Sequence, residues 1–320
     1  MTLVIASIHD NQITIVSDSK ISYDNDETTT RDELLRKPTL KCLIVSPTIA
    51  VGLAGSLPKD TDRLYRAIYS SPDDVDQTLA TLRDRSARYP ESFIAATLLP
   101  RPTLWRIRKG SVVSIDKPGR CVIGDQESYE LYMAREERCK HPNSTDVDEA
   151  QALRMAIQYF INIDNGPTYR SEPDKAAIRG FLGTSDGDFD RTIGGYLTEI
   201  LTTPSGFWYE PHTQLTLPDR MSYHIEQGEC GRTHLVARTD DPVVHQRYTL
   251  VGGPPNRRAI GFCLPEAKSG IFYPDGEPWN PTVFSAVSSA EEMVRTVWTD
   301  YRQMLMGLLQ PNYVTGQFFP

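Results

Sequence analysis

Thr2, directly after the initiator Met1, carries the most reactive arrangement of groups near the start of the chain. Methionine aminopeptidase removes Met1 when the next residue is small, which would leave a threonine with a hydroxyl and a free α-amine on one residue. The amine has an ordinary pKa of roughly 7.7 to 8.0, so a neutral fraction is present near neutral pH to accept the hydroxyl proton. Thr2 can therefore act as nucleophile and base together. The alternative is that Thr2 is merely a common residue at the second position.

Asp18 and Lys41 follow Thr2 at separations of 16 and 39 residues. A threonine hydroxyl is a poor nucleophile until a base takes its proton, and a nearby cation lowers the effective pKa of both hydroxyl and amine. Lys41 is the candidate cation. A buried lysine is costly unless it is paired, so Asp18 on a neighbouring strand is its expected partner. The alternative is an ordinary surface ion pair between strand ends.

Composition limits the classes of protein that fit. With 39% hydrophobic and 24% charged residues, the 320-residue chain is typical of a globular protein. Its net charge of -8 argues against a nucleic-acid binder. The apolar runs are far shorter than the roughly 20 residues of a membrane span, and the N-terminus lacks a basic n-region. Five scattered cysteines without CxxC spacing favour free thiols, so the cytoplasm is the expected location.

The elements that would position these residues begin with two hairpins. Strands are predicted at 2–8, 12–18, 39–45 and 49–54. Helices are predicted at 57–70 and 71–88, strands at 92–99, 104–107, 112–115 and 121–123, and helices at 127–138 and 146–163. In this order, helices would cover a two-layer sheet on both faces.

The segment 204–320 is harder to interpret, because its short strand candidates cannot be ordered into a sheet. These candidates are 233–237, 248–251, 259–263 and 270–273, and a closing amphipathic helix is predicted at 289–309. The spacing of its histidines and cysteine matches no standard zinc pattern, so neither a metal nor a cofactor is expected. The residues concerned are His212, His224, Cys230, His234 and His245.

Several stretches, taken in this order, resemble the proteasome β-subunit family and its bacterial relative HslV, within the N-terminal nucleophile hydrolases. They are Thr2, the stretch 17–22, Lys41, the stretch 49–56 ending in Gly55-Ser56, the stretch 122–124 and the stretch 193–197. The resemblance implies an α+β fold, a four-layer αββα sandwich over residues 1–203, with residues 204–320 as an extension packed on it. It also implies a threonine-type peptidase or amidohydrolase.

The resemblance further assigns roles to individual residues. The backbone amide of Gly55 would steady the oxyanion, and Lys20 and Ser22 would bind an extended substrate strand. The partners implied are a peptide or amide substrate and further copies of the chain, arranged in that family as a ring, without nucleic acid or membrane.

The chain departs from the family pattern at its supporting residues. Asp125 stands where the family has a serine, and its carboxylate would hydrogen-bond the Thr2 amine. Either Asp164 or Asp190 would fill the family's supporting aspartate position, and Ile193 occupies a second serine position. Two other functions remain open: a catalytically silent scaffold or binding subunit, and a small-molecule amidase or acyltransferase.

Overall fold

Asp10 and Asn11 turn the chain between its first two strands, β1 (Leu3–His9) and β2 (Gln12–Ser17). Both turn residues have positive φ angles, 49° and 60°, which aspartate and asparagine tolerate better than most residues. The computed structural model describes residues 3–19, 38–55, 61–127, 129–130, 132–133, 148–165, 195–216, 221–227, 233–239 and 245–307.

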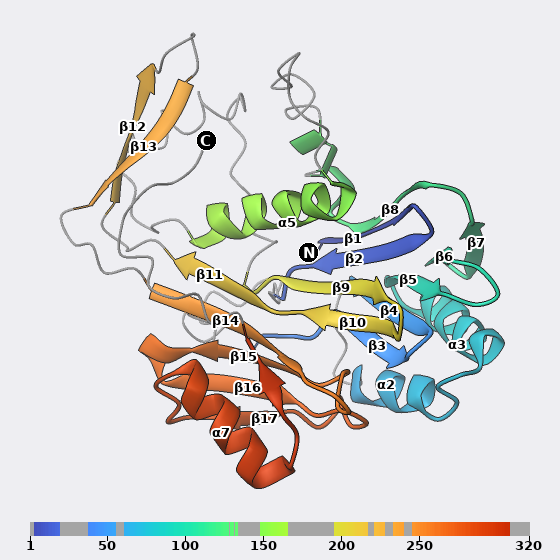
Figure 1. The fold of residues 1–320 in the computed structure, drawn as a ribbon. Helices are drawn as coiled ribbons and strands as arrows, with labels where there is room; N and C mark the ends of the chain where they lie inside the picture. Colours follow the sequence, from blue (N-terminus) through green and yellow to red (C-terminus); the bar gives the residue numbers. More distant parts are fainter. Residues whose placement is uncertain are drawn as a thin grey trace.

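The first sheet is built around this hairpin and has the strand order β10-β9-β2-β1-β8 (Figure 1). Its other strands are β8 (Gly119–Gly124), β9 (Thr198–Thr203) and β10 (Gly206–Glu210). All described pairings in this sheet are antiparallel, and Leu3 lies opposite Gly124. The start of β1 is therefore held against the end of β8.

The second sheet follows sequence order, β3-β4-β5-β6-β7. Its strands are β3 (Cys42–Ser46), β4 (Ile49–Ala54), β5 (Ser92–Thr97), β6 (Thr103–Arg108) and β7 (Ser111–Ile115). Two helices lie between β4 and β5 in sequence, α2 (Thr61–Tyr69) and α3 (Val75–Arg88), and α3 packs on β5, β6 and β7. Asp74 caps the start of α3 by accepting a hydrogen bond from the Gln77 N–H.

The two sheets pack face to face. Successive side chains of β1 point to opposite faces of the first sheet, so alternate residues face the second sheet. Val4 and Ala6 join the core shared with the second sheet, whereas Leu3 and Ile5 pack with α5 (Glu149–Asn165). At Gly52 the sheets approach so closely that an added Cβ would lie 2.7 Å from Cγ1 of Val4. A glycine is therefore required at this point of β4.

Residues after β10 build a third, six-stranded sheet with the path β11-β14-β15-β16-β17, and β18 pairs with β14. Its strands are β11 (His212–Thr216), β14 (His245–Gly252), β15 (Ile260–Leu264), β16 (Ser269–Tyr273), β17 (Thr282–Phe284) and β18 (Leu305–Met306). A short 3-10 helix, η2 (Pro265–Ala267), joins β15 to β16. The strands β12 (Met221–Gln227) and β13 (Thr233–Thr239) form a separate pair.

The third sheet packs on both the main core and its own helix. Ile260, Phe262 and Tyr273 belong to the same buried cluster as the two five-stranded sheets. On the other face lies α7 (Ala290–Tyr301) (Figure 1). Its Met293 and Val297 are fully buried. Residues far beyond 203 therefore contribute to the main core.

The expected four-layer αββα sandwich is wrong for this chain. Antiparallel sheet dominates the described residues, in two five-stranded sheets, a six-stranded sheet and a two-stranded pair, whereas only α2, α3, α5 and α7 are α-helices with described bounds. The expectation failed because it assigned helical layers from the first 203 residues and left the strands of 204–320 unordered. The chain has a β-rich fold.

Two expected boundaries also differ from the structure. The division at 203/204 falls in the turn between β9 and β10, which pair within one sheet. The closing helix ends at Tyr301 rather than at 309, because Arg302 takes a left-handed conformation with φ 57° and its N–H bonds the carbonyl of Trp298. Across the described ranges, no helix combines the length and apolar character needed to cross a membrane.

Candidate active site

One buried carboxylate joins the start of β1 to the start of β3. Oδ1 of Asp18 accepts a hydrogen bond from the Leu3 N–H at 3.1 Å, and Oδ2 lies 2.9 Å from Nζ of Lys41. The Asp18 side chain is 0% exposed and that of Lys41 is 2% exposed. The structure thus brings Asp18 and Lys41 together as a buried ion pair, not as a pair on the surface.

The ends of neighbouring strands place these residues. Asp18 directly follows β2, and Lys41 directly precedes β3, where its carbonyl accepts a hydrogen bond from the Leu53 N–H at 2.8 Å. The free edge of β3 is covered by tyrosines: the hydroxyl of Tyr209 donates to the Cys42 carbonyl at 2.9 Å, and that of Tyr65 donates to the Leu40 carbonyl. Both flanks of Lys41 are therefore fixed.

Ser19 extends this arrangement and was given no role from the sequence. Its hydroxyl accepts a hydrogen bond from the Tyr196 N–H at 2.7 Å, and its carbonyl accepts one from the Thr39 N–H at 2.9 Å. Gly195, just before Tyr196, has a positive φ of 81°. Ser19 thus links the residues that follow β2 to Thr39, close to Lys41, and to Tyr196, which directly follows Gly195.

Gly55 directly follows β4 and lines the same cleft as Gly124, which pairs with Leu3. The cleft has a volume of about 710 Å³ and opens between the two five-stranded sheets. Gly55 has a φ of 127°, and an added Cβ would lie 2.7 Å from the carbonyl oxygen of Pro90. Both the backbone angle and the close approach of Pro90 therefore require glycine here.

A cysteine nucleophile does not fit this site. Cys42 is adjacent to Lys41 but fully buried, and burial, its largest influence, raises the pKa of its thiol to about 12. The thiol is therefore protonated near neutral pH and is not the attacking form. Cys42 is thus a core residue next to the Asp18–Lys41 pair.

Other predicted site residues are only partly described. Asp125 is buried, and its carbonyl accepts a hydrogen bond from the Tyr129 N–H at 3.3 Å. Asp164 lies in α5, but its side chain is outside the described part. Four further candidates, Thr2, Lys20, Ser22 and Asp190, also lie outside the described residues.

A second buried charge cluster joins α5, β9 and β11. Glu199, whose side chain is 0% exposed, accepts two hydrogen bonds from Arg154, and Nε2 of His212 lies 2.9 Å from its Oε2. Burial alone would raise the pKa of Glu199, but His212 and Arg154 together lower it below its ordinary value. His212, one of the histidines considered above as zinc ligands, thus contacts the carboxylate of Glu199. No site of three potential ligands occurs among the described residues.

No family model matches this sequence, and a search of the curated proteins found no match. Activation of a residue next to Leu3 would use three features of this site. They are the buried cation of Lys41, the carboxylate of Asp18 that accepts a hydrogen bond from the Leu3 N–H, and Gly55 in the lining of the cleft.

Proposed function

We propose that this chain is an N-terminal threonine hydrolase that cleaves a peptide or another amide bond, with Thr2 as the nucleophile after removal of Met1. The bridge made by Asp18 supports this most strongly, since one carboxylate contacts the Leu3 N–H at 3.1 Å and the Lys41 ammonium at 2.9 Å. Thr2 is covalently bonded to that Leu3 nitrogen. A buried positive charge is therefore fixed one carboxylate away from the proposed nucleophile.

The proposed reaction has two half-steps. Thr2 Oγ attacks the carbonyl carbon of the amide while the α-amine of Thr2 accepts the hydroxyl proton. The C–N bond then breaks, and the leaving amine takes that proton, which leaves an ester on Thr2. Water attacks the ester, releases the acid and restores the hydroxyl. Lys41 favours the first step because its positive charge stabilises the deprotonated oxygen and keeps the amine neutral.

Gly55 would contribute its backbone N–H to the tetrahedral oxyanion. Donors of this kind are aimed at charge that develops only in the transition state, and loss of one costs on the order of 100-fold or more in rate. Gly55 lines the same cleft as Gly124, which pairs with Leu3. A carbonyl bound at the mouth of this cleft would lie between the N-terminal end of β1 and the C-terminal end of β4.

The resemblance of short stretches to the proteasome β-subunit family supports the proposed reaction. It does not extend to the fold. Assembly of copies of this chain, implied by the same resemblance, is proposed with it. The cytoplasm is the proposed location, in keeping with the free thiols of Cys42, Cys121 and Cys263.

The test compares the full chain with Thr2→Ala and Thr2→Ser. Alanine and serine are both small, so Met1 removal is expected in all three chains and is checked by intact mass. Hydrolysis of a panel of fluorogenic peptide and small-molecule amides should be lost in Thr2→Ala and retained in part in Thr2→Ser, which keeps a hydroxyl. Equal hydrolysis by the wild type and Thr2→Ala, or activity in a chain that keeps Met1, would contradict the proposal. Absence of hydrolysis in a processed wild type favours the silent scaffold.

A further inference from the structure

The cleft at Gly55 has a strongly basic wall. Besides Gly55 and Gly124, it is lined by Arg106, Arg108 and Lys109, at the end of β6 and in the turn to β7. All three cations are exposed. They are concentrated in one hollow of a chain whose net charge is -8.

The strand register shows which way the two arginines face. Arg106 and Arg108 are two residues apart on β6, so they share a face of the second sheet. Arg106 lies opposite Ile94, and Ile94 lies opposite Gly52. Gly52 faces Val4 of the first sheet, as its close approach to that side chain shows. The arginines therefore lie on the face turned toward the first sheet, where the space between the two sheets opens into the cleft.

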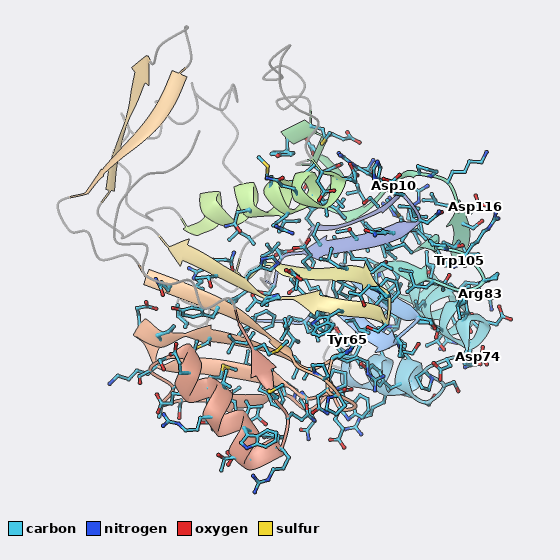
Figure 2. The ribbon with its side chains drawn as sticks, in the orientation of Figure 1. Asp10, Tyr65, Asp74, Arg83, Trp105 and Asp116 are labelled. Carbon is cyan, nitrogen blue, oxygen red and sulfur yellow. The ribbon has the colours of Figure 1, made fainter. Side chains whose placement is uncertain are left out.

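No acidic side chain of the described residues pairs with these three cations. Glu91 lines the cleft, but its side chain is only 1% exposed and it accepts hydrogen bonds from Arg85 at 2.8 and 3.1 Å. Asp116, labelled in Figure 2, pairs with Arg101 at the other end of the β6–β7 hairpin. The positive charge of the cleft wall is therefore not neutralised by these neighbouring acids.

The charge of Arg106 also acts on a buried residue of β8 in the first sheet. Burial raises the pKa of the Cys121 thiol in β8 to about 11, and the guanidinium of Arg106 opposes that rise. Its charge therefore reaches the first sheet in the same strand that carries Gly124.

We infer that this cleft binds an acidic peptide segment, with Asp or Glu carboxylates held by Arg106, Arg108 and Lys109. Guanidinium groups fit carboxylates in two-point hydrogen bonds, and Lys109 adds a point charge at the turn. The volume of about 710 Å³ falls within the roughly 300 to 1,000 Å³ of ligand pockets. Because the rest of the chain repels anions, the basic cleft directs such a peptide to this place.

That the acidic segment belongs to the substrate rests on the proposed function, since the cleft adjoins Gly55. Binding is therefore measured without catalysis, in the full chain carrying Thr2→Ala. The probe is a fluorescein-labelled hexaglutamate peptide followed by fluorescence anisotropy, with hexaglutamine, hexalysine and phosphoserine peptides compared. Failure of binding would overturn this inference and leave the hydrolase proposal standing, whereas a failed Thr2 test would leave the binding result intact.

The decisive variant is Arg106→Gln/Arg108→Gln, and its matched control is Arg63→Gln/Arg83→Gln, which removes the same charge from α2 and α3. The cleft variant should bind hexaglutamate more weakly, by about tenfold for each guanidinium, because each charge-assisted contact is lost. The control should change affinity by less than about twofold. All four positions are exposed, so melting temperatures should stay within about 2 °C of the parent.

Salt and competitor experiments complete the test. Binding should weaken as salt rises from about 0.05 to 0.5 M, because screening acts on exposed charges. Hexaglutamine binding as tight as hexaglutamate, or a cleft variant that binds like its control, would overturn the inference. A phosphoserine peptide that binds more tightly than hexaglutamate would overturn the assignment to carboxylates.

Discussion

Oδ2 of Asp18 lies 2.9 Å from Nζ of Lys41, with both side chains closed off from solvent. The other oxygen of the same carboxylate bonds the amide of Leu3. Because Asp18 contacts both groups, the pair connects the first sheet to the second at the start of β1, next to the proposed nucleophile Thr2.

Lys41→Met should destabilise the protein strongly. It removes the ammonium that lies 2.9 Å from the buried carboxylate of Asp18, and breaking a buried pair by removing one partner costs about 3 to 5 kcal/mol. Denaturant unfolding measures the loss, with Arg83→Met, from the exposed Arg83–Asp84 pair, as the control that should change by less than about 1 kcal/mol. A Lys41→Met protein as stable as the wild type would show that Lys41 is not held as a charged partner.

Gly55→Ala should reduce both stability and turnover. Its φ of 127° is strained for alanine. The new Cβ would also lie 2.7 Å from the Pro90 carbonyl oxygen, so the backbone at the C-terminal end of β4 must shift. We expect a loss of about 1 to 3 kcal/mol in unfolding free energy and a rate loss on the order of 100-fold, because the proposed oxyanion donor moves.

The control for Gly55→Ala is Gly276→Ala. Gly276 also has a positive φ, 86°, but an added Cβ would meet nothing within 4 Å. This variant should lose stability through backbone strain and keep full turnover. Equal turnover in the two variants would argue against a catalytic role for the Gly55 amide.

Glu199 should make the fold sensitive to acid. Its pKa is lower in the folded chain than its ordinary value, since His212 and Arg154 outweigh the effect of burial. The stabilisation is therefore present above the unfolded pKa of about 4.3 and is lost as pH falls through the lower folded pKa. The stability difference between wild type and Glu199→Gln should shrink between about pH 6 and pH 3, as followed by urea unfolding.

Glu210 provides the control of opposite sign. Burial, followed by the nearby charge of Glu199, raises its pKa, so its contribution to stability is present at low pH and is lost as pH rises through the folded pKa. The free energy of unfolding of Glu210→Gln, relative to that of the wild type, should therefore be highest near neutral pH. The same pH trend in both variants would contradict the assigned shifts.

The first strands were predictable from the sequence because their signals are local. Apolar runs separated by Asp10-Asn11 and by Pro47-Thr48 define β1 to β4, and a buried lysine's need for a counter-charge pointed to Asp18. The six-stranded sheet depends on pairings such as His212 with Thr249, between strands far apart in sequence, which short runs do not specify. The early end of α7 at Arg302 was also hidden, because arginine has no preference for a left-handed cap.

The basic cleft was missed for a related reason. Arg106 and Arg108 alternate with apolar residues on β6, a pattern that normally indicates a solvent-exposed face. Only the register through Ile94 to Gly52 shows that this face turns toward the first sheet. The roles assigned to Thr2, Asp125, Asp164 and Asp190 stay predictions.

The most direct measurement is covalent labelling of the full chain with a threonine-directed electrophile, read by intact mass and by mapping of the labelled peptide. We predict a single adduct on Thr2 in a chain that has lost Met1. The adduct should be absent from Thr2→Ala, and it should form much more slowly in folded Lys41→Met. Full labelling of Thr2→Ala, or an adduct mapped to another residue of the wild type, would contradict the assignment of Thr2 as the nucleophile.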